Sequence, residues 1–263
     1  MRIAIVVGVG FMLAACGGHS VDLGVNDSGA GGDGAGGGSP FFLQAVLATP
    51  QASEAPCTFT SSPKQPTFST GILDVEAESA FANAYYAEFL VGNRLDTGSE
   101  VEETSRVIIA GAYVTVTDST GNELANYTTL GAGQVDPAPP GGVAYGPVNF
   151  EIVDPATVTS LREKLPPFGK TTITTRTQVY GETLGGESVT SNVFEFGITA
   201  CRGCLIAFDT APDVEPQPNC LGHGPAGEDG QGACFYGQDV PFDCHACSDI
   251  DPFCLCAKSS CPK

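Results

Sequence analysis

Apolar and polar residues alternate along several segments between residues 39 and 200. The first segment shows the pattern clearly, because Phe41, Leu43, Ala45 and Leu47 are separated by less apolar positions. A period of two, with many β-branched residues, is typical of half-buried β-strands. The same pattern predicts further strands at 72–75, 85–91, 107–110, 112–116, 124–128, 143–153, 171–180 and 189–198.

One segment has the spacing of a helix instead. Asp154 is suited to the N-cap and Pro155 to the first helical position, and Val158, Leu161 and Leu165 follow at helical intervals. These residues predict a short helix from 155 to about 164, at one end of the strand-rich domain.

Turn residues separate the predicted strands. The segment 118–122, Asp-Ser-Thr-Gly-Asn, predicts a turn, and Leu-Gly-Gly-Glu at 184–187 predicts a hairpin. Eight or nine strands in about 160 residues are typical of a β-sandwich. We therefore expect a mainly β domain over 39–200, an immunoglobulin-like or related antiparallel β-sandwich with one short helix.

The amino-terminal residues have the features of a secretory signal peptide. Arg2 supplies a positive charge, residues 3–12 are apolar, and Leu13-Ala14-Ala15-Cys16 ends the segment with small residues. The apolar run is shorter than the roughly 20 residues that span a bilayer. We expect residues 1–15 to be removed; an ordinary signal peptide with a chance cysteine is the alternative.

Leu13-Ala14-Ala15-Cys16 also resembles the bacterial lipobox, which implies acylation of Cys16 and a lipid bilayer as its partner. Two acyl chains are sufficient for stable anchoring. Gly17 stands where Asp would retain a lipoprotein in the inner membrane, so the resemblance favours the outer membrane or cell surface. Residues 16–38 hold ten glycines and few apolar side chains, and we expect a lipidated flexible tether.

The charge of the chain excludes one class of partner. Lys and Arg number 11 against 30 Asp and Glu, a net charge of −19. Without a cluster of basic residues, such a chain is repelled by polyanions. We expect no nucleic-acid partner, and we expect an envelope protein or an extracellular ligand in its place.

The cysteines predict a disulfide-stapled tail over 201–263, where nine of them lie. Of 11 cysteines, ten remain after Cys16, an even number that permits five disulfides in an oxidising compartment. The sequence leaves their connectivity open, and Cys57 would join the tail to the sandwich. The candidates are Cys57, Cys201, Cys204, Cys220, Cys234, Cys244, Cys247, Cys254, Cys256 and Cys261.

Two C-x-x-C pairs in the tail raise an alternative, a zinc site or a redox dithiol. They are Cys201 with Cys204 and Cys244 with Cys247, and 39 residues separate them. A zinc ribbon usually has about 15 to 20 residues there, and a redox motif belongs in a βαβ unit. We therefore favour structural disulfides, with no metal and no cofactor.

Catalytic chemistry is difficult to assemble from this sequence. The three histidines, His19, His223 and His245, lie in the tether and tail, so none can serve a nucleophile in the sandwich. Several glutamates lie on or near predicted strands, where the outward face is the favoured interpretation of their positions. They are Glu88, Glu102, Glu103, Glu151 and Glu195.

We therefore predict that the protein is not an enzyme and has a binding or structural role. Sugar binding is disfavoured by the absence of Trp. Tyr85, Tyr86 and Tyr113 could replace it as stacking platforms, but their strand positions favour packing in the fold.

Several short motifs resemble those of uncharacterised lipoproteins of myxobacterial type, over about half of the chain. The resemblance implies a place in the cell envelope and supplies no catalytic residue. The motifs are Val91-Gly92-Asn93-Arg94-Leu95, Thr104-Ser105-Arg106-Val107, Gly111-Ala112-Tyr113-Val114, Tyr180-Gly181-Glu182-Thr183-Leu184-Gly185-Gly186 and Cys201-x-Gly203-Cys204.

Overall fold

A computed structural model describes residues 39–49, 58–77, 84–95, 104–207, 235 and 237–243. The chain divides into two compact units, Met1–Gly37 and Gly38–Lys263, and every described residue belongs to the second. The predicted signal peptide and tether lie outside the described residues. So do Cys57, Cys220, Cys234, Cys244, Cys247, Cys254, Cys256 and Cys261, and likewise Glu102, Glu103 and the three histidines.

The described residues form a mainly β structure of two large sheets and one helix, as predicted. The four-stranded sheet has the order β2-β1-β4-β7, formed by Thr67–Phe68, Phe41–Leu47, Tyr85–Asn93 and Ala144–Val153. The six-stranded sheet has the order β3-β10-β8-β5-β6, formed by Thr70–Asp74, Phe194–Cys201, Lys170–Thr183, Val107–Asp118 and Glu123–Val135. β9 (Ser188–Thr190) also pairs with β8, and β11 (Ile206–Ala207) pairs with β12 (Phe242–Asp243).

Two strand pairs depart from the predicted antiparallel arrangement. β3 and β10 run parallel, with Asp74 opposite Cys201, and β11 and β12 are also parallel. A parallel pair needs a long connection between its strands, and 119 residues separate Asp74 from Phe194. Local sequence patterns carry no information about such a distant partner, so this pairing was not predicted.

The core lies between the two large sheets, where the inward residues of both are buried. Phe89 and Phe150 from one sheet and Val114 and Ile173 from the other belong to one cluster. At the β6–β7 contact, a Cβ atom added at Gly131 would collide with the ring of Phe150. Glycine at this position therefore lets the sheets approach each other.

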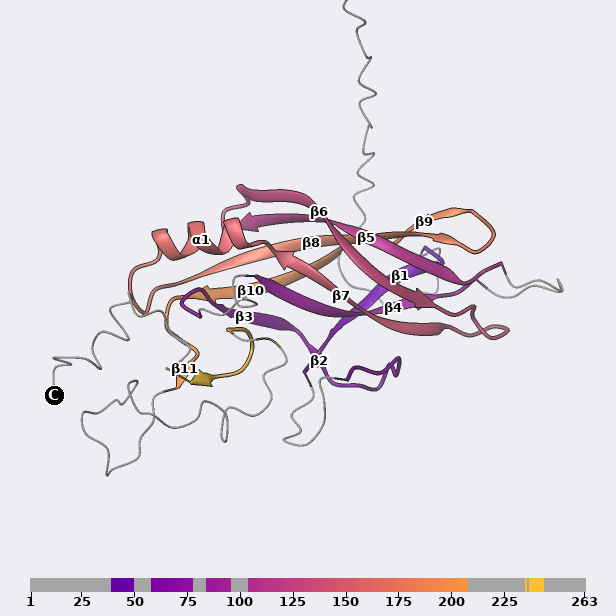
Figure 1. Cartoon of the computed structure of the whole chain (residues 1–263), viewed down its shortest axis with the longest axis horizontal. Coiled ribbons are helices and arrows are strands. Elements are labelled where there is room, and N and C mark those ends of the chain that lie inside the picture. Colours follow the sequence, from indigo (N-terminus) through magenta and orange to yellow (C-terminus); the bar gives the residue numbers. More distant parts are fainter. Residues whose placement is uncertain are drawn as a thin grey trace, which may run out of the picture. The chain divides into compact units, whose positions relative to one another are not determined.

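The helix α1 spans Pro155–Lys164, and its predicted N-cap is confirmed. Oδ1 of Asp154 accepts a hydrogen bond from the Thr157 amide at 3.2 Å. Val158 and Leu161 are buried in the core cluster. Figure 1 shows α1 and the β8–β9 hairpin at opposite ends of the sandwich. Within the described residues, no helix is long and apolar enough to cross a membrane.

Bulges account for the main errors in the predicted strands. The segments 107–110 and 112–116 belong to the single strand β5, whose register shifts between Ile109 and Gly111. The predicted strand 189–198 is divided into β9 and β10, because the Oγ atom of Ser191 accepts the Val179 amide hydrogen at 2.9 Å. A serine side chain there takes the place of a backbone carbonyl.

Candidate functional site

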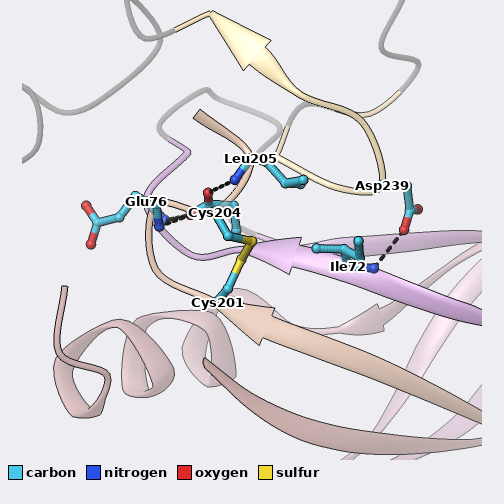
Figure 2. The surroundings of a disulfide bond; sticks show 8 residues. Ile72, Glu76, Cys201, Cys204, Leu205 and Asp239 are labelled. Atoms are coloured by element: carbon cyan, nitrogen blue, oxygen red, sulfur yellow. Dashed lines mark hydrogen bonds between the residues drawn. A yellow bond between two sulfur atoms is a disulfide. The ribbon is translucent and has the colours of Figure 1, made fainter. Parts of the chain in front are cut away.

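The Cys201–Cys204 disulfide lies where β10 ends (Figure 2). The two Cα atoms are 5.8 Å apart, and Cys201 is only 1% exposed, whereas Cys204 is on the surface. The predicted disulfide chemistry is confirmed for these two cysteines. Their pairing with each other within one C-x-x-C motif is the part that the sequence left open.

The carboxylate of Asp74, at the end of β3, lies beneath the disulfide loop. Its Oδ1 accepts hydrogen bonds from the amides of Gly203 at 2.8 Å and Glu76 at 3.1 Å. Its Oδ2 accepts one from the Leu205 amide at 2.7 Å. Asp74 is fully buried, and Figure 2 shows the bonds of Leu205 and Glu76 beside the disulfide.

The backbone of Gly203 makes this convergence of amides possible. Its φ angle is +85°, in the left-handed region that residues with a Cβ atom rarely adopt. The loop can therefore turn within the two residues between the cysteines and aim the Gly203 and Leu205 amides at one carboxylate. The positive φ angle explains why glycine occupies the third position of the C-x-G-C motif.

The position of Asp74 opposes thiolate chemistry at the two cysteines. A carboxylate oxygen and both sulfur positions lie within 4.8 Å of one another. A nearby negative charge disfavours a second one in a buried site, and thiol exchange requires the thiolate. The surroundings of the pair therefore favour the closed disulfide over a redox dithiol.

The same three residues form the one potential metal-ligand group found within the described part of the chain. They fit a metal poorly, because both carboxylate oxygens already accept backbone hydrogen bonds and the sulfurs are joined. Zinc would need two free thiolates and a released carboxylate. The other predicted zinc ligands, Cys244 and Cys247, lie outside the described residues.

A buried ion pair fixes the loop from its other side. The guanidinium of Arg202 pairs through Nε with Glu76, which is 1% exposed, and another of its nitrogens donates to the Leu165 carbonyl at 3.1 Å. The Arg202 backbone exchanges hydrogen bonds with Gly169 and Phe168, each at 3.0 Å. The loop is thus tied to the segment that joins α1 to β8.

A short part of the tail docks on the same edge of the sandwich. The Gly237 carbonyl accepts the Asp74 amide hydrogen at 2.8 Å. The Ile72 amide donates to Oδ1 of Asp239 at 2.8 Å, and the Asp239 amide donates back to the Ile72 carbonyl at 2.9 Å. Figure 2 shows Ile72 and Asp239 facing each other. This segment of the tail therefore extends the β3 edge.

The docked segment also reaches the second sheet. The hydroxyl of Tyr85 donates to Oδ2 of Asp239 at 2.7 Å, and burial raises the pKa of the Asp239 carboxyl. The side-chain amide of Gln238 accepts from the Tyr86 amide at 2.9 Å and donates to its carbonyl at 2.7 Å. Gln238 thus fills the bulge of β4 at Tyr85 and Tyr86 and joins both sheets.

The glutamates singled out in the sequence fall into two environments. Glu195 is exposed and pairs with Arg176 at 3.2 Å. Glu88 and Glu151 lie two rungs apart on the β4–β7 ladder and therefore on the same, outward face of the smaller sheet. Burial raises the pKa of both carboxyls, and the Tyr86 hydroxyl donates to Glu151 at 3.3 Å. The sequence could not place these two side by side.

The three tyrosines considered as stacking platforms also differ from one another. Tyr85 is packed in the core, as predicted, and Tyr86 is half-buried and stacks on Phe235 at 5.9 Å. Tyr113 is 49% exposed, so its predicted packing was wrong. It lies on the outward face of β5, where its ring meets that of Tyr180 at 4.8 Å.

The sequence matches no known protein family and no curated protein.

Proposed function

We propose that this chain is an exported, lipid-anchored envelope protein whose disulfide-locked β-sandwich has a non-catalytic binding role. The observation that carries the proposal is the Cys201–Cys204 disulfide closed over the buried carboxylate of Asp74. A site that disfavours free thiolates suits an oxidising compartment, where disulfides form and persist. Both the signal-peptide-like residues 1–16 and the disulfide therefore support export.

The anchoring part of the proposal rests on residues 1–16. The lipobox-like Leu13-Ala14-Ala15-Cys16 would leave an acylated Cys16 as the first mature residue, followed by a glycine-rich segment. Absence of Asp at position 17 favours the outer membrane or the cell surface. The resemblance to myxobacterial lipoproteins points to the same compartment.

The buried acidic groups support binding over catalysis. Asp74 and Asp239 each accept hydrogen bonds on both carboxylate oxygens, and Glu76 pairs with Arg202. Groups held in this way serve the fold, because proton transfer or nucleophilic attack would require breaking their existing contacts. The docked segment 237–243 and the sandwich then form a joint surface for a ligand.

The first test compares the full chain with Cys16→Ser and Ser20→Ala variants expressed in a bacterial host. The wild type and Ser20→Ala should partition with membranes and carry an acyl mass on Cys16, and Cys16→Ser should lose both. Alkylation without reduction should leave Cys201 and Cys204 unmodified. An unacylated wild type would overturn the anchor, and free thiols at Cys201 and Cys204 with stoichiometric zinc would favour the metal-binding alternative.

A further inference from the structure

A pocket of about 680 Å³ lies where the docked tail segment meets the loop that precedes β2. The end of β1 supplies one wall, the segment 58–66 a second, and Asp239 with Val240 a third. The volume falls within the range of small-molecule sites, roughly 300 to 1,000 Å³. The pocket is therefore large enough for a ligand of one or two sugar rings.

The loop that forms the second wall is held in place from within. Oε1 of Gln65 accepts hydrogen bonds from the Thr60 amide at 2.9 Å and the Thr60 hydroxyl at 2.8 Å. The Ala48 amide donates to the Pro66 carbonyl at 2.8 Å, which joins the loop to the end of β1. A wall fixed before the ligand arrives lowers the entropic cost of binding.

The third wall is equally constrained. Asp239 has a φ angle of +63°, and both of its carboxylate oxygens are engaged, by the Ile72 amide and the Tyr85 hydroxyl. A backbone in this region is uncommon for a residue other than glycine, although Asp tolerates it better than most. The docked tail therefore contributes a fixed part of the pocket.

The chemistry of the lining matches a neutral polyol. Four residues of the lining carry hydroxyl groups, which can donate and accept hydrogen bonds; they are Thr49, Thr58, Thr60 and Ser62. The Thr60 hydroxyl already donates to Gln65 and remains an acceptor. Phe68 adds an aromatic surface to this lining, on which the C–H face of a ring can pack. Alternating hydroxyl and C–H surfaces are the chemical signature of a sugar.

Charge argues against ionic ligands. Lys64 and Asp239 are the charged side chains among the described lining residues, and they have opposite signs. The chain as a whole has a net charge of −19, which repels anions. A single lysine at the pocket does not offset that repulsion, so an uncharged ligand fits better than an acidic one.

We propose that this pocket binds a neutral mono- or disaccharide, with the docked tail segment as one of its walls. The proposal rests on the binding role proposed above and specifies its ligand class. Phe68 takes the place that Trp often has in sugar sites, and the threonine and serine hydroxyls supply the polar contacts.

The test uses full-length acylated protein in a zwitterionic detergent, because glycosidic detergents would compete for the pocket. Saturation-transfer NMR is recorded with glucose, N-acetylglucosamine, cellobiose and chitobiose as probes. We expect saturable binding of at least one of them, weakened at least about tenfold in Thr49→Val/Thr58→Val, which removes two hydroxyls without changing volume. Phe68→Ala should cause a comparable loss.

A matched variant separates the loss of pocket contacts from general effects of substitution on the fold. Thr128→Val makes the same chemical change on the exposed face of β6, outside the pocket lining, and should leave the affinity unchanged. No binding of any probe to acylated wild type would overturn the pocket and leave the anchor proposal standing. If the purified protein proves to be unacylated but binds a probe, the anchor proposal is overturned and the pocket proposal stands. Equal loss in Thr128→Val would also contradict a neutral-sugar pocket.

Discussion

Two aspartates each organise a turn, one inside the protein and one on its surface. Asp74 accepts three backbone amide hydrogens beneath the disulfide loop, two of them from Gly203 and Leu205. Asp118, in the β5–β6 turn, accepts from the Thr120 amide and hydroxyl and from the Asn122 amide and side chain, at 2.7 to 3.0 Å. The two carboxylates thus accept similar numbers of hydrogen bonds, but Asp74 joins distant segments and Asp118 joins residues within one turn.

The difference shows how burial changes the value of the same interaction. Around Asp118, water can replace any lost hydrogen bond, because the residues of that turn are exposed. Around Asp74, a lost acceptor leaves buried amides without a partner, and each unsatisfied buried donor is costly. Asp74 also joins β3, β10 and the docked tail, whereas Asp118 joins residues that are already neighbours.

The largest expected effect is that of Asp74→Ala. This change leaves three buried amides without an acceptor and should lower the free energy of unfolding by roughly 3 to 5 kcal/mol. Urea denaturation followed by circular dichroism measures the loss. Asp74→Asn retains one acceptor oxygen and should lie between wild type and Asp74→Ala. A loss no greater than that of Asp118→Ala would show that burial does not separate the two sites.

Removal of the disulfide should have a smaller effect. The closed loop contains only four residues, so the loss of chain entropy predicts about 2 kcal/mol for Cys201→Ser/Cys204→Ser. If Asp74 and the disulfide hold the same loop, the triple variant should lose less than the sum of the two changes. Additive losses in urea unfolding would mean that they stabilise separate parts of the molecule.

The local site at Asp118 could be predicted from the sequence, whereas the long-range site at Asp74 could not. The Asp118 turn, the N-cap Asp154 and the hairpin at Gly185 and Gly186 were predicted, because each depends on residues a few positions apart. The longer strands were predicted from alternation, apart from their bulges, whereas the two-residue strands β2, β11 and β12 were not. Local hydrogen bonding and periodic burial are the parts of the fold that a single sequence displays.

The Asp74 site depends on contacts that no local pattern encodes. Two of its three donors, Gly203 and Leu205, lie 129 and 131 residues away in the chain. The available signal was a charged residue inside an apolar strand, Leu73-Asp74-Val75, which implies a buried partner without naming it. The disulfide chemistry was predicted, but the pairing of Cys201 with Cys204 was left open by the sequence. The pocket needs the docked tail, which only the folded chain brings there.

A third prediction tests the surface aspartate through pH. Hydrogen bonds, first from Thr120 and then from Asn122, hold the pKa of the Asp118 carboxyl well below its usual range. The folded state therefore favours the ionised group, whose stabilisation is present above the unfolded pKa of about 3.9 and declines as the pH falls. Asp118→Ala should shift the urea midpoint less than the disulfide variant at pH 7. If Asp118→Ala shifts the urea midpoint equally at pH 7 and pH 2, the stabilisation does not come from the ionised carboxylate.

The smallest expected effect has the opposite sign, and it concerns the half-buried carboxylate of Glu88. Burial raises the pKa of Glu88, and an interaction with Asn149 offsets only part of this rise. Because the folded pKa exceeds the unfolded value, wild-type stability declines as the pH rises through the interval between them. Glu88→Gln removes this titration and should unfold at a slightly higher urea concentration than wild type at pH 7.

Measurement at acidic pH separates this electrostatic gain from altered packing. At pH 3 the glutamate is protonated in both the folded and unfolded states, so wild type and Glu88→Gln should have nearly the same midpoint. Glu151→Gln should act in the same direction but more weakly, because the bond that its carboxylate accepts from Tyr86 is altered. If Glu88→Gln is instead less stable than wild type at pH 7, the ionised carboxylate has donors that stabilise it, as Asp74 does.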